Sequence, residues 1–377
     1  MARHIAIALS GGVDSAVAAY LLKKTGAQVT ALHLRFYASN PQARQRFEQQ
    51  EAQAKAIAQE LDLDWQVLDV DQKQQQLVVQ PFINAYQQGS APNPCITCNK
   101  QIKFGYLLDR IKAQGFDYLA TGHYAQIIHQ QGQWQLVAAQ DQSKDQSYFL
   151  YQLTEQQLPQ LLFPLGKLYK SQVKVLAKDY WPKLESTESF DICFLQGTSL
   201  SQFLGSRITN QIGEVVDKEG LVVGSHQGQA FYTIGQRQGL TIDPQQLKRS
   251  HSIQLVNGQV PVLYVVAKDP ATNRLVVGTR ESCFKQQFVI KQLSFVNQQD
   301  QLKWQSKQQL YALVKIRNTG RLVAGQIGMQ NQQLLVTTKE ALFAPAVGQA
   351  AVFYQKTTSY DRVVAGAIID TPAAIGY

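Results

Sequence analysis

The stretch Ser10-Gly11-Gly12-Val13-Asp14-Ser15 decides the fold of the first half of the chain. It follows an apolar run, residues 5–9, that is typical of a buried parallel strand, and it leads into a helical run over residues 16–22. A strand, a glycine turn and a helix N-terminus direct several backbone N–H groups at one point, where the helix dipole favours an anion. The two serines add hydroxyl donors, and Asp14 adds a carboxylate that can hold Mg²⁺ beside a phosphate. The stretch therefore predicts a phosphate-binding loop, although not a Walker A loop, because no Gly-Lys-Ser/Thr follows the glycines.

Strand and helix patterns alternate from this loop onward. Strands are predicted over residues 29–34, 65–70 and 118–120, and helices over residues 44–61, 72–88 and 102–114. Such alternation predicts an α/β fold with a doubly wound parallel sheet, whose ligands bind at the carboxyl ends of the strands. Thr121-Gly122-His123-Tyr124 follows one of these strands, so it is expected to share a pocket with residues 10–15. A turn of small residues without a ligand is the alternative, and the density of polar groups disfavours it.

The pattern changes near residue 200, where helical periodicity gives way to short β-rich runs separated by glycine turns. We interpret this part as a small central β domain and a C-terminal barrel of about six strands. The predicted domains are 1–197, 198–282 and 283–377. A hairpin is predicted over residues 127–139, turning at Gln131-Gly132.

Composition narrows the class of protein. The chain has 377 residues, 45% of them hydrophobic, and a formal net charge of +9, which favours a polyanionic partner such as nucleic acid. Four cysteines are too few for a disulfide scaffold of this length and fit a reducing compartment. Because neither a signal-peptide pattern nor an apolar run of membrane-spanning length is found, we expect a cytoplasmic protein.

Two cysteines stand in the proline-rich stretch Pro92-Asn93-Pro94-Cys95-Ile96-Thr97-Cys98-Asn99, just before the helix expected to begin near Ile102. A helix N-terminus stabilises a thiolate, so Cys98 is predicted to be a nucleophile of low pKa. A redox pair and half of a zinc site are the alternatives, and no second Cys or His pair at short spacing supports zinc. Cys193 by itself is predicted to be a buried structural cysteine, and Cys283, which has no motif around it, is predicted to be inert.

In combination, these motifs resemble the tRNA-specific 2-thiouridylases, a family of the PP-loop ATP pyrophosphatases. The resemblance spans nearly the whole chain and rests on the loop at 10–15, the Cys95–Cys98 stretch with Ile102-Lys103-Phe104, and several further motifs. These are Ala120-Thr121-Gly122-His123-Tyr124, Lys144-Asp145-Gln146-Ser147-Tyr148, Phe163-Pro164-Leu165-Gly166, Asp191-Ile192-Cys193-Phe194, His226-Gln227-Gly228, Thr233-Ile234-Gly235-Gln236-Arg237 and Gly348-Gln349.

The resemblance implies an enzyme that uses ATP and Mg²⁺ to form 2-thiouridine at the tRNA wobble position through an adenylated uridine. It implies that Cys98 is the nucleophile and that Cys193 carries sulfur as a persulfide, supplied by a cysteine-desulfurase relay, with a Cys98–Cys193 disulfide as the product. It assigns ATP binding to Ala8, Leu9, Ser10, Gly11, Gly12, Val13, Asp14, Ser15, Leu34 and Gly122. The target base would contact Asn93, Pro94 and Cys95, and the rest of the tRNA would contact His123, Lys144, Asp145, Gln146, Arg317, Asn318 and Gln349.

Cys95 stands where many members of that family have aspartate, and this departure keeps a second route to the same product open. Cys95, Cys98 and Cys193 would offer three thiolates to a [4Fe–4S] cluster, leaving one iron to bind sulfide. Two other functions are the alternatives: a PP-loop amide synthetase acting on a small acid, and an RNA-binding protein with a degenerate ATP site. The amide synthetase would need neither a basic C-terminal barrel nor paired cysteines.

Overall fold

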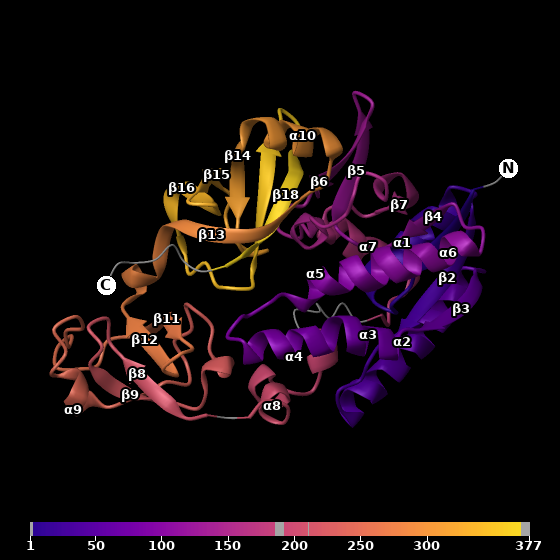
Figure 1. The fold of residues 1–377 in the computed structure, drawn as a ribbon. Helices are drawn as coiled ribbons and strands as arrows, with labels where there is room; N and C mark the ends of the chain where they lie inside the picture. The colour runs from indigo at the N-terminus through magenta and orange to yellow at the C-terminus, as the bar shows by residue number, and fades with distance from the viewer. Residues whose placement is uncertain (1–2, 185–191, 210, 371–377) are drawn as a thin grey trace.

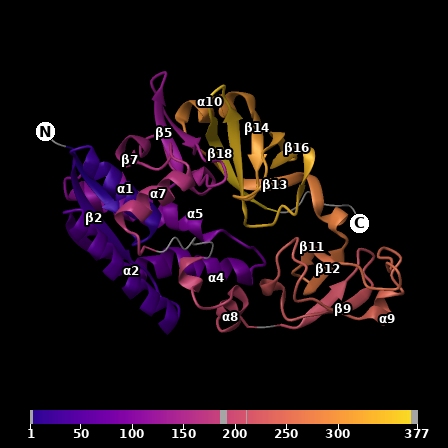
Figure 2. The ribbon, with the colours of Figure 1, turned by 180° about the vertical axis from the view of Figure 1, so that it is seen from behind.

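The computed structural model describes residues 3–184, 192–209 and 211–370, so Asp191 of the motif quoted above lies outside the described residues. Figures 1 and 2 show an α/β unit, a small β unit and a barrel arranged around one junction. None of the described helices is long and apolar enough to cross a membrane.

A five-stranded parallel sheet forms the α/β unit, in the order β3-β2-β1-β4-β7. Its strands are β1 (His4–Ala8), β2 (Gln28–Arg35), β3 (Asp64–Asp69), β4 (Tyr118–Ala120) and β7 (Leu161–Leu162). The order runs outward from β1 in both directions, which places a crevice at the carboxyl ends of β1 and β4. Residues 10–15 follow β1 and residues 121–124 follow β4, so both predicted motifs lie at this crevice.

Helices cover both faces of the sheet, which confirms the predicted doubly wound fold. Alternate residues of β1 supply the two cores, because Ile5 and Ile7 pack into one cluster and Ala6 into the other. The first face carries α1 (Val13–Lys24), α2 (Pro41–Glu60) and α7 (Lys170–Tyr180). The second face carries α3 (Asp71–Gln74), a π-helical segment (Gln75–Val79), α4 (Gln80–Gln87), α5 (Pro94–Cys98), a π-helical segment (Asn99–Leu107) and α6 (Leu108–Ala113).

The helix that carries the cysteines begins at Pro94, eight residues earlier than the sequence pattern predicted. Asn93 is its N-cap, and the Asn93 side chain accepts a hydrogen bond from the backbone N–H of Cys95 at 3.0 Å. A capping asparagine followed by proline at the first helical position is a standard start signal, because the missing proline N–H has no partner there in any case. Cys98 therefore ends the first turns of a long helix instead of preceding one.

The β-rich part forms two sheets. The central sheet has the order β10-β9-β8-β12-β11, with β8 (Gly213–Val216), β9 (Val222–His226), β10 (Thr241–Ile242), β11 (Tyr264–Asp269) and β12 (Arg274–Gly278). The barrel strands are β13 (Phe284–Phe295), β14 (Gln309–Lys315), β15 (Val323–Gln330), β16 (Gln333–Phe343), β17 (Ala350–Lys356) and β18 (Asp361–Ile369). Pairing of β13 with β18 closes this barrel, which confirms the prediction of about six strands. The shorter helices are α8 (Leu200–Gly205), α9 (Pro244–Leu247) and α10 (Gln298–Lys307).

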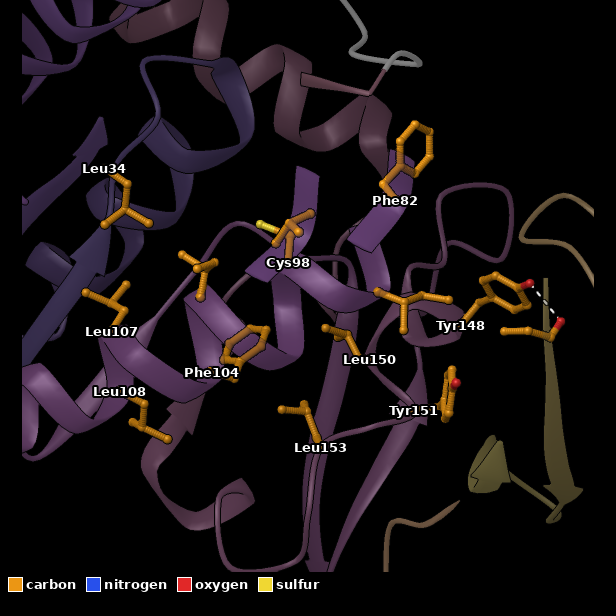
Figure 3. Close-up of a cluster of buried hydrophobic side chains, with 14 of the residues drawn as sticks. Leu34, Phe82, Cys98, Phe104, Leu107, Leu108, Tyr148, Leu150, Tyr151 and Leu153 are labelled. Atoms are coloured by element: carbon orange, nitrogen blue, oxygen red, sulfur yellow. Dashed lines mark hydrogen bonds between the residues drawn. The ribbon is translucent and has the colours of Figure 1, made fainter. Parts of the chain in front are cut away.

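The predicted hairpin forms from β5 (Ala125–Gln130) and β6 (Gln133–Ala138), but its outer partner belongs to the barrel. Val137 of β6 pairs with Arg362 of β18, so the hairpin extends the barrel sheet instead of the parallel sheet. Next to it, the Tyr148 hydroxyl donates to the backbone oxygen of Ala350 at 2.9 Å, and the Tyr151 ring lies against Gly366. Figure 3 shows both tyrosines at the barrel side of a core cluster that also contains Cys98.

Candidate active site

The phosphate-binding loop is held by its own hydroxyl groups. The Ser10 backbone N–H donates to Ser15 Oγ at 3.1 Å, and Ser15 Oγ donates to the Gly12 oxygen at 2.9 Å. Gly11 has φ +86°, and a Cβ there would lie 2.4 Å from the backbone oxygen of Gln50 on α2. The loop is therefore preformed, with glycine required by both its backbone angle and its neighbour.

Residues 121–124 lie against the same helix terminus. A Cβ on Gly122 would lie 3.0 Å from the backbone nitrogen of Ser15, so the two loops approach backbone to backbone. The Tyr124 hydroxyl donates to Asp14 Oδ1 at 2.7 Å. The expectation that both motifs share one pocket is confirmed.

That pocket is a cavity of about 350 Å³ at the carboxyl ends of β1 and β4. Seven of the residues predicted to bind ATP line it: Ala8, Leu9, Ser10, Asp14, Ser15, Leu34 and Gly122. Gly11 and Gly12 instead face a neighbouring polar cavity of about 610 Å³ beside α2, and Val13 is buried. The wall also contains Thr121, His123, Gln146, Lys103 and Cys193. The cavity thus joins the phosphate-binding loop to one of the predicted sulfur carriers.

Lys170 is a site residue that the sequence patterns did not reveal. Its Nζ lies 2.6 Å from Asp14 Oδ1, and its side chain is largely buried at the start of α7. Tyr124 uses the same oxygen of Asp14, so one oxygen receives both contacts. Mg²⁺ is commonly held by one or two carboxylates together with nucleotide phosphates, and Asp14 fits as a protein ligand of that kind.

The three cysteines differ in exposure. Cys95 is exposed, Cys193 is half-buried on the cavity wall, and Cys98 is buried at 8% exposure. Gln74 Nε2 donates to Cys193 Sγ at 3.5 Å. Figure 3 shows Cys98 among the apolar side chains of the core cluster.

The predicted low pKa of Cys98 is wrong. Burial raises the pKa of Cys98 to about 12, since an apolar environment disfavours the thiolate. Its position at the end of α5, instead of before a helix, removes the N-terminal dipole on which the prediction rested. Lys103 opposes the shift, because its ammonium lowers the pKa of the Cys98 thiol without cancelling the effect of burial.

The pH dependence of Cys98 reactivity follows from this pKa. Because the thiolate is the reactive form, the alkylation rate of Cys98 by iodoacetamide is expected to rise about tenfold per pH unit from pH 7 to 10 without a plateau. Mass spectrometry of the Cys98 peptide measures this rate in the protein alone. A plateau near pH 8.5, about the value of an ordinary thiol, would contradict the assignment.

A [4Fe–4S] cluster would need three thiolates that converge on one point. The three thiols are near one another, because the charge of Cys193 raises the pKa values of Cys95 and Cys98, and the charge of Cys95 raises that of Cys98. Within the described ranges, however, no group of three or more Cys, His, Asp or Glu side chains is placed to hold a metal ion. The arrangement of the thiols in this structure does not fit the cluster.

Lys103 is the second functional residue that the patterns missed. Among the described residues that line the cavity it is the only lysine or arginine, and it lies in the π-helical segment five residues after Cys98. Its charge lowers the pKa values of Cys98, Cys95 and Cys193 against the effect of burial. π-Helical turns often mark functional sites, and here the segment carries the cation toward the cavity. The motif Ile102-Lys103-Phe104 was quoted above, but its spacing alone gave Lys103 no role.

The residues predicted to contact tRNA are not all brought together. His123 and Gln146 line the cavity, and burial keeps the pKa of His123 well below its usual value, so its ring is neutral. Asp145 is buried beside Gln146, and its carboxylate accepts hydrogen bonds from the Ala139 N–H and from Ser147. Lys144 is half-buried beside this turn.

The other predicted contacts lie on the barrel. The Arg317 guanidinium is half-buried, donates to the Ala344 oxygen at 3.1 Å and lies over the Phe343 ring. Asn318 follows it, with a buried Oδ1 that has no hydrogen-bond partner in the described part of the chain. Gln349 donates to the backbone oxygen of Ala91, close to the predicted base-contacting residues Asn93, Pro94 and Cys95.

Comparison with known proteins gives full-length matches. Residues 3–197 match the tRNA methyl transferase HUP domain, 201–279 the tRNA methyl transferase PRC-barrel domain, and 285–369 the aminomethyltransferase beta-barrel domain. The tRNA-specific 2-thiouridylase MnmA of Clostridium perfringens is 35% identical over 382 residues, covering 98% of this chain and 99% of its own length. MnmA of Sulfurimonas denitrificans is 34% identical over 357 residues, covering 94% of this chain and 96% of its own length.

Among solved structures, the U34-tRNA thiolase NcsA of Methanococcus maripaludis, determined with its [4Fe-4S] cluster, is 18% identical with a TM-score of 0.34. The match covers 54% of this chain and 63% of the NcsA chain. A likeness this weak has no bearing on the chemistry of the cysteines.

Proposed function

We propose, because the chain belongs to the tRNA-specific 2-thiouridylase family, that it is an ATP-dependent enzyme that converts the wobble uridine of tRNA to 2-thiouridine. The observation that supports this most directly is the shared cavity, whose wall contains both the phosphate-binding loop and Cys193. Activation of a base and delivery of sulfur to it require these two features within reach of one another.

The first step activates the base. The uridine O2 is a poor leaving group, so it attacks the α-phosphate of ATP, forms an adenylate and releases pyrophosphate. The N–H groups of the loop at the start of α1 stabilise the phosphate charge. Mg²⁺ held by Asp14 would neutralise further charge on the phosphates. Lys170 and Tyr124 hold the Asp14 carboxylate in place for this role.

The second step delivers sulfur. A persulfide on Cys193, supplied by a persulfide donor such as a cysteine-desulfurase relay, attacks C2 of the adenylate, and AMP leaves with O2 and the bonding electrons. The Cys98 thiolate then attacks the Cys193 sulfur, which breaks the S–S bond of the persulfide and leaves sulfur on C2. The product is a Cys98–Cys193 disulfide, which a cellular thiol reduces. Cys193 lies on the cavity wall, and Cys98 is buried near enough that the charge of Cys193 raises its pKa, which supports this division of roles.

Lys103 is expected to assist sulfur transfer by stabilising the thiolate and persulfide anions. Lys103→Met should slow 2-thiouridine formation by about tenfold or more, because an adjacent cation shifts a thiol pKa by about one unit or more. Lys100→Met is the matched control, since Lys100 is exposed on the same helical segment. Single-turnover thiolation and AMP formation should be measured together. Equal rates for the two variants would refute a role for Lys103.

The remaining assignments concern the tRNA. We infer that residues 1–197 form the catalytic domain and that residues 198–282 and 283–377 form the domains that bind tRNA. The formal net charge of +9 supports binding to a polyanion. His123, Lys144, Asp145, Gln146, Arg317 and Asn318 remain candidates for direct contact, and residues 93–95 for contact with the flipped base.

The proposed function is tested by nucleoside mass spectrometry of tRNA incubated with the protein, Mg-ATP and a persulfide donor, with and without oxygen. Formation of 2-thiouridine by iron-free protein would support the persulfide route. If 2-thiouridine forms only with anaerobic, iron-containing protein that absorbs at about 400 nm, the cluster route is indicated instead. ATP turnover that tRNA does not stimulate would contradict the tRNA substrate.

A further inference from the structure

The connection between α4 and α5, residues 88–93, lies where the three parts of the molecule meet. In Figures 1 and 2 this loop extends away from the parallel sheet toward β11 and β12 and beneath the barrel. It leads directly into the helix that carries Cys95 and Cys98. Its position therefore bears on the site, although it lines neither the ATP cavity nor the cavity beside α2.

Both β domains hold the backbone of this loop. Lys268 of β11 donates from Nζ to the oxygen of Gly89 at 3.1 Å. The Ala91 N–H donates to the oxygen of Val347 at 2.8 Å, and Gln349 Nε2 donates to the oxygen of Ala91. Three hydrogen bonds thus join residues 89–91 to the two other domains.

The contact with the barrel is close. Gly348 has φ +90°, and a Cβ on it would lie 2.9 Å from the Ala91 nitrogen, so the two backbones touch directly. On the other side, burial lowers the pKa of Lys268 to about 8. The half-buried side chain directs its Nζ at the carbonyl oxygen of Gly89 and not into solvent.

The segment between the hydrogen-bonded residues 89–91 and the two cysteines is short and stiff. Pro92 and Pro94 each have a fixed φ, and Asn93 between them caps the helix by accepting from the Cys95 N–H. A displacement of Ala91 therefore shifts the helix start, and Cys98 with it. The same stretch contains the predicted contacts with the target base.

We propose that Lys268 and Gln349 are positioning residues for thiolation, which hold the connection 88–93 so that residues 93–95 and Cys98 keep their positions relative to Cys193 on the cavity wall. This differs from the role that the family resemblance implies for Gln349, a direct contact with tRNA. It also makes the outer domains part of the catalytic geometry, in addition to their role in binding RNA. The kinetic part of the inference rests on the proposed function, whereas its structural part does not.

The test compares Lys268→Met and Gln349→Leu with Lys248→Met, which removes an exposed lysine of the same domain. Hydrogen exchange of the free protein should rise about tenfold in residues 89–98 for the first two variants only, the factor that loss of one buried hydrogen bond corresponds to. Their kcat for 2-thiouridine formation should fall by a similar factor, with KM for tRNA unchanged.

Unchanged exchange together with a raised KM for tRNA would overturn the proposal and identify the two residues as RNA contacts. Increased exchange throughout the central sheet would also overturn it, because the residues would then support folding in general. If the unsubstituted protein forms no 2-thiouridine, the proposed function fails, and the exchange comparison still decides whether these residues position residues 89–98.

Discussion

Cys98→Ser and Cys193→Ser are each expected to abolish 2-thiouridine formation while tRNA adenylation continues. Serine keeps the size of cysteine but cannot carry a persulfide or attack one. Neither thiol belongs to the phosphate-binding loop, so ATP activation should survive in both variants. Release of AMP or pyrophosphate that depends on tRNA measures the first step, and nucleoside mass spectrometry measures the second.

Cys283→Ser is the matched control for this pair. Cys283 is also buried and free, but it packs in a separate cluster with Val216 and Val266, away from the cavity. The Cys283→Ser variant should therefore thiolate tRNA at the normal rate. A normal rate in Cys98→Ser or Cys193→Ser would show that the assigned sulfur chemistry is wrong.

Gly11→Ala is expected to reduce adenylation at least about 100-fold, because the loop cannot keep its shape with a Cβ. That Cβ would meet the backbone oxygen of Gln50 at 2.4 Å, and the oxygen belongs to α2, so it cannot rotate away. ATP–pyrophosphate exchange and the melting temperature should be measured for the same samples.

Gly26→Ala separates the two causes of this loss. Gly26 has a similar positive φ, +76°, but a Cβ there would have no atom within 4 Å. Both variants bear the cost of a left-handed alanine, on the order of 1 kcal/mol. Only Gly11→Ala adds the collision at the phosphate-binding loop. Equal adenylation by the two variants would show that the approach of α2 to the loop has no catalytic importance.

Local patterns predicted most of the fold. The position of the phosphate-binding loop, the parallel sheet and the closed barrel follow from periodicity and from glycine turns, which depend on neighbours in the sequence. The helix start at Pro94 is also local information, because Asn93-Pro94 is a capping signal, but the apolar periodicity on which the predicted start at Ile102 rests begins only later.

The parts of the site that were missed depend on long-range contacts. Lys170 contacts Asp14 although the two residues are 156 positions apart in the sequence, so no local spacing indicates this pair. The pKa of Cys98 depends on the side chains that surround it, which a motif cannot specify. The hydrogen bond from Gln349 to Ala91 is also long-range, so no sequence pattern predicts it. The family resemblance implied only a contact between Gln349 and RNA.

The pairing of β6 with β18 has a consequence for biosynthesis. The hairpin leaves the ribosome early, but its outer partner is the last strand of the barrel, so residues 139–360 are synthesised before the pair can form. At typical elongation rates this interval is on the order of ten seconds or more. During that time the outer edge of β6 presents unpaired backbone groups, which promote association between nascent chains. Completion of the C-terminus thus protects the N-terminal half, and a chain interrupted before β18 exposes an aggregation-prone edge.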